Sequence, residues 1–189
     1  MHSSIILASQ SPRRQQLLQW AEIPFEVIVS HSDESFPVGL SFEEAAIHIA
    51  LQKAIAVSSQ VKDGKIILAA DTIVVWKDSM LGKPVDRYEA IDFLQKLSGS
   101  IHKVITGVCI LQHQKETCFT DTTEVAFHSL TDEQIEFYVD QYKPYDKAGA
   151  YAIQEWIGVT GIKSIKGDFY NVMGLPVSRV IQALKNFGQ

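Results

Sequence analysis

Four side chains near the N-terminus can together bind an anion: Ser9, Ser11, Arg13 and Arg14. Both arginines fall in the expected first turn of a helix, where the helix dipole already places about half a positive charge. A bound anion would reverse this unfavourable balance, because backbone N–H groups, hydroxyls and guanidinium groups all donate hydrogen bonds to phosphate oxygens. The cluster therefore predicts a phosphate-binding site. The alternative is a basic helix start that is only solvated.

A carboxylate, Asp71, interrupts the apolar run 66–76. Burying a carboxylate is costly unless it is ion-paired, hydrogen-bonded or bound to a metal. Asp71 is therefore a candidate general base or metal ligand, the alternative being a structural carboxylate that bonds nearby backbone. Glu34, in the polar segment 32–35, is a second carboxylate, although acids in loops are usually only solvated.

Two lysines also occupy constrained positions. Lys53 lies on the apolar face of the helix expected over 41–59, where the alternative is a stem that packs while its amine reaches water. Lys83 stands between Gly82 and Pro84, which restrict the backbone and so direct the side chain; the alternative is an ordinary turn lysine.

These residues are more informative as a set than one by one. Two arginines and two lysines can neutralise a polyphosphate, while Glu34 and Asp71 can hold Mg²⁺ or Mn²⁺ beside its phosphates. One carboxylate can also orient an attacking water. The set predicts hydrolysis of a phosphoanhydride, in which positioning and charge stabilisation provide most of the catalysis. The sequence contains neither a GxxxxGK[ST] loop nor the paired loops of a kinase.

Alternating strands and helices must position these residues. Ser11 is suited to cap the first helix and Pro12 to begin it, since its missing N–H costs nothing there. Capping pairs begin three later helices, at Ser41, Asp86 and Thr131, and Pro176 begins the last. We expect strands over 5–8, 25–29, 66–76, 101–111 and 117–127, and short extended pieces over 162–165 and 169–172. The mixture of strand–helix units with a hairpin predicts an α/β fold with a mixed sheet.

Composition limits the classes of protein. The chain has 189 residues, of which 46% are hydrophobic and 21% charged, and its net charge is −5. We expect a single domain over residues 1–189, which can divide into two lobes around one cleft. No apolar run approaches the ~20 residues of a membrane span, and the first residues lack the pattern of a secretory signal. An acidic chain argues against polymeric nucleic acid and favours a small phosphorylated ligand.

The two cysteines, Cys109 and Cys118, lie in expected strands. They match neither a disulfide framework nor a CxxC site, so we expect them to be packing residues. They fit a reducing compartment, most simply the cytoplasm.

The chain resembles the Maf nucleotide pyrophosphatases. The resemblance begins with the opening signature at 7–18 and continues in family order over nearly the whole chain, through the blocks 33–35, 52–54, 70–72, 82–84, 106–108, 148–151 and 167–176. It implies an α/β fold with an elongated mixed sheet flanked by helices and a deep nucleotide-binding cleft. It also implies a cytoplasmic, metal-dependent enzyme that converts a nucleoside triphosphate to the monophosphate plus pyrophosphate, and a homodimer.

The resemblance also implies roles for individual residues. Asp71 matches the proton acceptor, while Arg13, Thr72 and Gln154 match residues associated with substrate choice. Gln154 in the segment 150–154 is similar to the branch that acts on dTTP and UTP. A glutamine amide offers one donor and one acceptor, which can pair with adjacent positions on the edge of uracil or thymine. The alternative is a glutamine that only bonds local backbone.

Two departures from the family pattern stand out. His48 occupies a position where arginine is common, and residues 155–157, Glu-Trp-Ile, follow Gln154 where glycine is common. The second departure adjoins the residue associated with base choice, so another base preference stays open. Two further alternatives are a nucleotide-binding regulator of cell division or shape with little turnover, and a phosphatase that releases orthophosphate.

Overall fold

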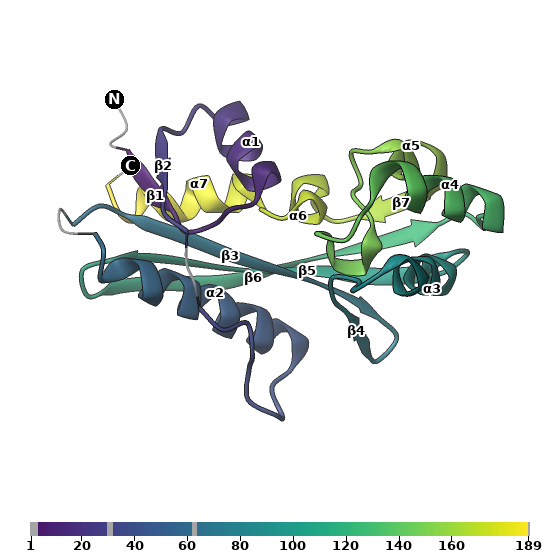
Figure 1. The fold of residues 1–189 in the computed structure, drawn as a ribbon. Helices are drawn as coiled ribbons and strands as arrows, with labels where there is room; N and C mark the ends of the chain where they lie inside the picture. The colour runs from purple at the N-terminus through teal and green to yellow at the C-terminus, as the bar shows by residue number, and fades with distance from the viewer. Residues whose placement is uncertain (1–3, 30–31, 62–63, 189) are drawn as a thin grey trace. The chain divides into compact units, whose positions relative to one another are not determined.

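A computed structural model describes residues 4–29, 32–61 and 64–188 of the chain (Figure 1). Its described strands form one sheet: β1 (Ile5–Leu7), β2 (Phe25–Val27), β3 (Ile67–Trp76), β4 (Ser79–Leu81), β5 (Ile101–Gln112), β6 (Lys115–Phe127) and β7 (Ile162–Lys166). The strand order is β2-β1-β3-β5-β6-β7, and β4 pairs with β3. β1 is parallel to both β2 and β3, whereas β4 is antiparallel to β3 and β7 to β6. This confirms the mixed α/β sheet.

Helices flank the sheet, as predicted. They are α1 (Pro12–Trp20), α2 (Phe42–Ser58), α3 (Arg87–Leu97), α4 (Asp132–Tyr142), α5 (Trp156–Gly161), α6 (Phe169–Met173) and α7 (Val177–Lys185), with a short 3₁₀ turn, η1, at Ala148–Ala150. The chain divides into two compact units. The first comprises Met1–Thr72, Thr106–Asp121 and Gly174–Gln189, and the second comprises Ile73–Ile105 and Thr122–Met173.

In the first unit, α1 and α7 lie on one side of the strands and α2 on the other (Figure 1). The core beneath α2 contains small and branched side chains from the helix, from β1 and the residue that follows it, and from β3: Ile6, Ala8, Ala54, Val57, Ile67 and Ala69. α2 approaches β5 so closely that a Cβ on Gly107 would lie 2.3 Å from the carbonyl oxygen of Ala46. Glycine at 107 therefore fixes how close α2, with its Lys53, can lie to the strand.

The predicted helix caps at Ser41 and Thr131 are confirmed. The Ser41 side chain accepts a hydrogen bond from the Glu44 N–H, and the Glu44 carboxylate accepts one from the Ser41 N–H. Thr131 and Gln134 form the same reciprocal pair before α4. These local bonds satisfy backbone donors that the first helical turn leaves without partners.

The second unit contains a buried aromatic cluster between β5, β6 and the segment after η1. The rings of His102, Phe127 and Tyr151 contact one another at centroid distances of 5.2–5.5 Å. Gly149, in η1, has a φ of 68°, and a Cβ there would lie 2.9 Å from a methyl group of Val74. Glycine is thus required at 149 both by its backbone conformation and by its packing.

One predicted element was wrong. Residues 169–172 were expected to be extended, but Phe169–Met173 form the helix α6. The Asp168 carboxylate accepts a hydrogen bond from the Tyr170 N–H at 2.8 Å, which satisfies a donor at the start of the helix. The aromatic and branched residues of this segment favour strands, but strand preference depends strongly on tertiary context, and here the segment is helical.

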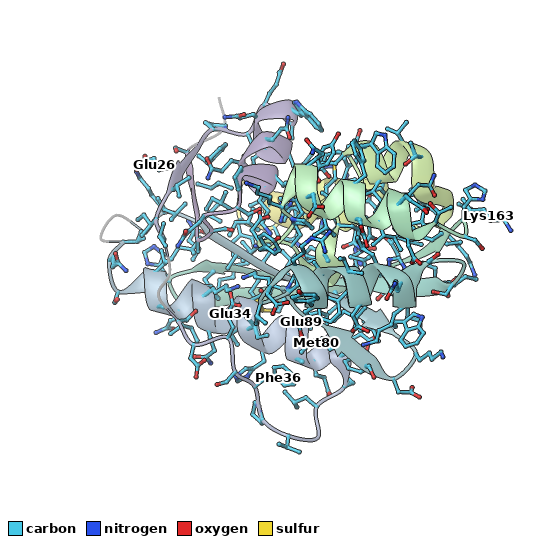
Figure 2. All side chains as sticks on the ribbon, turned by 45° about the vertical axis from the view of Figure 1, so that its right-hand side comes forward. Glu26, Glu34, Phe36, Met80, Glu89 and Lys163 are labelled. Atoms are coloured by element: carbon cyan, nitrogen blue, oxygen red, sulfur yellow. A yellow bond between two sulfur atoms is a disulfide. The ribbon has the colours of Figure 1, made fainter. Side chains whose placement is uncertain are left out.

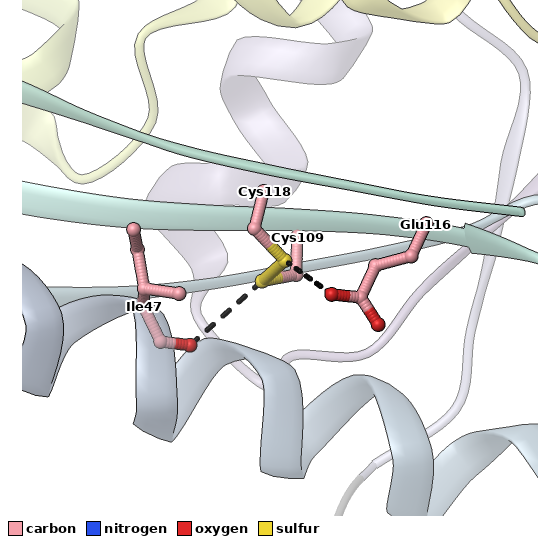
Figure 3. The surroundings of a disulfide bond; sticks show 4 residues. All are labelled: Ile47, Cys109, Glu116 and Cys118. Atoms are coloured by element: carbon pink, nitrogen blue, oxygen red, sulfur yellow. Dashed lines mark hydrogen bonds between the residues drawn. A yellow bond between two sulfur atoms is a disulfide. The ribbon is translucent and has the colours of Figure 1, made fainter.

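The expectation for the cysteines was also wrong. Cys109 on β5 and Cys118 on β6 form a disulfide across the hairpin, with their Cα atoms 4.2 Å apart (Figure 3). Cys109 is fully buried, and its Sγ lies 3.7 Å from the Ile47 carbonyl oxygen on α2. The pairing depends on which residues face each other across the hairpin, and composition and spacing do not determine that register.

Candidate active site

The ammonium group of Lys53 joins two carboxylates. Its Nζ lies 2.6 Å from Oδ1 of Asp71 on β3 and 2.8 Å from Oε1 of Glu34, which extends from the loop before α2 (Figure 2). The Lys53 and Asp71 side chains are only 12% and 13% exposed, whereas Glu34 is 52% exposed. The carboxylate within the apolar strand is therefore ion-paired, which offsets part of the cost of its burial. The Lys53 amine therefore does more than reach water, and the Asp71 carboxylate does more than bond nearby backbone.

The position of Asp71 follows from the parallel strands. β1 pairs with β3 at Ile67 and Leu68, and just after β1 the Ala8 N–H donates to the Leu68 carbonyl. Beyond this point β1 gives way to the loop containing Ser9, while β3 continues through Asp71 and Thr72. Ligands of open α/β sheets bind just outside the carboxyl ends of strands, so this is the edge where a nucleotide site is expected.

Arg14 is directed into the protein. Its guanidinium group donates through Nε to the Gly174 carbonyl at 2.8 Å, through Nη1 to Ser9 Oγ at 3.1 Å and through Nη2 to Thr72 Oγ1 at 3.0 Å. Burial is the main cause that lowers its pKa, and the negative charge of Asp71 opposes that effect. Three of its five N–H donors are thus occupied by protein acceptors. This arginine links the β1–α1 loop to β3 and to the segment between α6 and α7.

Thr72 belongs to the same network. Its Oγ1 accepts from Arg14 and lies 3.0 Å from Oγ1 of Thr106, a fully buried residue of β5. Successive side chains of a strand point to opposite faces, so Asp71 faces α2 while Thr72 faces α1. Thr106 and the Gly174 carbonyl were not among the predicted site residues. A threonine within the otherwise apolar run 104–110 was the sequence signal that could have identified Thr106.

The remaining residues of the N-terminal cluster lie at the start of α1. Ser11 occupies the N-cap and Pro12 the first helical position, as predicted. Within the described chain, the Ser11 side chain makes no capping bond; instead its N–H donates to Ser9 Oγ at 3.2 Å. Arg13 is half-buried and Arg14 buried. The two adjacent arginines are therefore in different environments.

Lys83 and Gln154 belong to the second unit. Lys83 is exposed in the segment after β4. The Gly149 N–H holds this segment by donating to the Gly82 carbonyl at 3.0 Å. Gln154 is exposed in a turn that the Glu155 N–H closes by donating to the Ala152 carbonyl at 3.1 Å. The structure thus brings together Glu34, Lys53 and Asp71, and also Ser9, Arg14 and Thr72, within the first unit.

Over 4–29, 32–61 and 64–188 no group of three or more His, Cys, Asp and Glu side chains gathers as a metal site. Glu34 and Asp71 instead form a pair that one cation joins, which fits the way Mg²⁺ is bound by one or two carboxylates together with substrate phosphates. No helix in the same part of the chain has the length and apolarity to cross a membrane.

Comparison with known proteins agrees with the resemblance found in the sequence. The family described as Maf-like protein matches residues 4–187. A dTTP/UTP pyrophosphatase of Parabacteroides distasonis is 49% identical over 184 residues, which cover 97% of this chain and 95% of that protein. A dTTP/UTP pyrophosphatase of Cytophaga hutchinsonii is 50% identical, covering 97% and 84% respectively. A HAM1 protein of Coxiella burnetii shares the fold, with a TM-score of 0.50, 15% identity and coverage of 98% and 100%. The chain belongs to the Maf family.

Proposed function

We propose that this protein hydrolyses dTTP and UTP, releasing the nucleoside monophosphate and pyrophosphate. The observation that carries the proposal is the Glu34–Lys53–Asp71 cluster at the carboxyl edge of β1. The relatives from Parabacteroides distasonis and Cytophaga hutchinsonii, both described as dTTP/UTP pyrophosphatases, support it.

In this proposal Asp71 accepts the proton of the attacking water. The water oxygen forms a bond to the α-phosphorus, the bond from that phosphorus to the oxygen bridging the α- and β-phosphates breaks, and pyrophosphate leaves. Asp71 is suited to this role because it is a carboxylate at the ligand edge of the sheet, held in place by Lys53. Lys53 also provides a cation for phosphate oxygens, and Lys83 is assigned the same role.

The N-terminal cluster binds the phosphates in this proposal. Arg13 and the hydroxyls of Ser9 and Ser11 donate to phosphate oxygens, as expected at the start of a helix. Arg14 contributes through the two N–H groups that its protein acceptors leave available. Its larger contribution is to hold Ser9 and Thr72 in position.

A divalent cation, Mg²⁺ or Mn²⁺, completes the site in this proposal. Glu34 and Asp71 would hold it, because their carboxylates already converge on one cationic group. When bound, the ion neutralises negative charge on the phosphate oxygens.

Base choice is assigned to Gln154, with Arg13 and Thr72. Uracil and thymine present an acceptor, a donor and an acceptor along one edge, of which a glutamine amide can pair with two. A pocket that leaves a buried polar group unpaired with the wrong base can reject that base strongly. We therefore expect CTP, ATP and GTP to be hydrolysed poorly.

We place the enzyme in the cytoplasm, which contains its nucleoside triphosphate substrates. We also propose that it is a homodimer and that it binds neither polymeric nucleic acid nor a membrane. The net charge of −5 supports the exclusion of nucleic acid. Sedimentation of the purified protein checks the dimer.

Product analysis tests the proposal. The purified protein is incubated with a panel of nucleoside triphosphates and Mg²⁺ or Mn²⁺, and pyrophosphate and orthophosphate are measured separately. Pyrophosphate from dTTP and UTP is the expected result. Orthophosphate would indicate a phosphatase, binding without either product would indicate a regulator, and pyrophosphate from a purine triphosphate alone would contradict the assigned base preference.

A further inference from the structure

The turn at residues 152–155 presents Gln154, to which the proposed function assigns base choice. Ala152 and Ile153 are 5% and 4% exposed, whereas Gln154 is exposed. The bond from the Glu155 N–H to the Ala152 carbonyl closes the turn. Gln154 is thus the exposed member of a turn whose preceding residues are buried.

Tyr138, on α4, bonds to both ends of this turn. Its ring is fully buried, and its hydroxyl accepts a hydrogen bond from the Ala152 N–H at 3.2 Å. The same hydroxyl donates to Oε2 of Glu155. A phenolic hydroxyl has one proton to donate and lone pairs to accept, so both bonds form at once. One atom of α4 therefore links the residues on either side of the Ile153–Gln154 pair.

A buried cation holds Glu155 from its other oxygen. Nζ of Lys147 lies 3.6 Å from Oε1 of Glu155 and 2.7 Å from Oδ1 of Asp146. The Lys147 and Glu155 side chains are 10% and 24% exposed, so solvent screens this pair less than it screens a surface pair. Both oxygens of the Glu155 carboxylate thus have partners.

An aromatic contact fixes the next residue. The ring of Trp156 packs edge-on against Phe137, with centroids 4.9 Å apart. Two adjacent residues of α4 therefore hold the two residues that follow Gln154. Residues 155–157 are also where the sequence departs from the glycine common in the family, and a glycine at 155 would have no side chain to bond Tyr138 or Lys147.

We propose that Glu155, together with Tyr138 and Lys147, is a positioning group for base choice. It contacts no substrate; it holds the turn so that the Gln154 carboxamide meets the base from one direction. A less firmly held turn would let the Gln154 side chain reach the base from other directions, so that its rotatable carboxamide could also pair with the edge of cytosine, which presents the opposite pattern at two of its positions. This inference rests on the proposed function, because it assumes that Gln154 contacts the base.

The test compares UTP with CTP in three variants. Tyr138→Phe removes the bridging hydroxyl, Glu155→Gly introduces the residue common in the family, and Glu155→Gln retains an acceptor for Tyr138. We expect the ratio of kcat/KM for UTP to that for CTP to fall about 3- to 10-fold in Tyr138→Phe and Glu155→Gly, which is the size of effect that one lost hydrogen bond usually has. Most of this change should appear in KM. Glu155→Gln should keep most of the wild-type ratio.

The matched control is Tyr142→Phe. Tyr142 lies one turn later on α4, its ring stacks on that of Tyr138 at 4.9 Å, and it is 38% exposed. The change deletes the same group from the same helix and should leave the ratio unchanged. Because both substrates are measured on one preparation, a partly unfolded variant loses both rates equally and its ratio is unaffected.

A double-mutant cycle identifies the interaction itself. If Tyr138 acts through Glu155, then Tyr138→Phe should change the ratio little in the Glu155→Gly background. The inference would be overturned if the UTP-to-CTP ratio were unchanged in both single variants, or if the two changes had fully additive effects on that ratio. In that case, release of pyrophosphate from UTP by the wild-type protein would still support the proposed function. A wild-type protein that releases no pyrophosphate from dTTP or UTP contradicts the proposed function itself.

Discussion

The ammonium of Lys53 lies 2.6 Å from Oδ1 of Asp71, and both side chains are nearly nine-tenths buried. Lys53 comes from α2 and Asp71 from β3, so packing of the helix on the strand brings them together. The close approach of α2 to Gly107 fixes that packing. The pair holds the carboxylate in place at the ligand edge of the sheet.

Replacement of Asp71 tests its role as proton acceptor. We expect Asp71→Asn to lower kcat by ~10²–10⁴-fold, the range for loss of a positioned acid–base group. Asparagine is nearly isosteric, so the variant should fold. Asp78→Asn, at an exposed turn position, is the matched control and should retain wild-type turnover. A folded Asp71→Asn protein with near wild-type kcat would exclude the assignment.

Removal of Lys53 tests its contact with phosphate. Lys53→Met keeps an apolar stem but leaves Glu34 and Asp71 without their shared cation. We expect affinity for a non-hydrolysable UTP analogue to weaken by about 1.5–3 kcal/mol, and affinity for UMP to weaken much less. Calorimetric titration measures both. Lys65→Met, which removes an exposed pair with Glu26, is the control, and equal losses for both ligands would exclude contacts to the β- and γ-phosphates.

The adjacent arginines should differ in their effect on stability. Arg14→Met removes three hydrogen bonds between a buried guanidinium and protein acceptors, so we expect the free energy of unfolding to fall by about 2–4 kcal/mol. Arg13→Ala removes a cation from a helix N-terminus, so Tm should hold or rise. Urea unfolding of the two variants checks the contrast. Equal destabilisation would contradict the different roles given to these side chains.

Acid should destabilise the protein through His102. Burial lowers the pKa of His102 to about 3, and its Nε2 lies 2.7 Å from the Tyr151 hydroxyl. An unfolded histidine titrates near 6.5, so between the two values the unfolded state binds more protons and stability falls as pH falls. His102→Gln keeps a polar partner for Tyr151 but cannot titrate. Its free energy of unfolding should therefore change less between about pH 7 and about pH 4 than that of the wild type; parallel curves would show that another group is responsible.

The disulfide should contribute to stability only under oxidising conditions. Cys109 and Cys118 are separated by 9 positions, and closing a loop of that size stabilises a protein by about 2–3 kcal/mol. Cys118→Ser should therefore lower the free energy of unfolding by this amount without reductant. With reductant, variant and wild type should unfold alike. Two titratable thiols in the native, unreduced protein would contradict the bond.

Local signals in the sequence were sufficient for most of the elements and for the family. The capping pair Ser41–Glu44 is complete within four residues, so both of its hydrogen bonds depend on local sequence and not on distant segments. The apolar run around Asp71 likewise specified a buried strand containing a carboxylate that needs a partner. The signature at 7–18 identified the family and, with it, the candidate site residues.

The partners of those residues depended on the tertiary structure. Lys53 and Asp71 are 18 positions apart, Arg14 and Thr72 are 58 apart, and Arg14 and Gly174 are 160 apart. Residue type alone gave Arg14 and Arg13 the same role, but Arg14 is buried and bonded to three protein acceptors, whereas Arg13 is half-buried. The pairing of Cys109 with Cys118 depends on hairpin register, and the bonds from Tyr138 to the Gln154 turn depend on how α4 packs. Sequence determines which groups need partners; packing decides which partners they meet, because burial brings distant segments within hydrogen-bonding distance and excludes the water that would otherwise satisfy them.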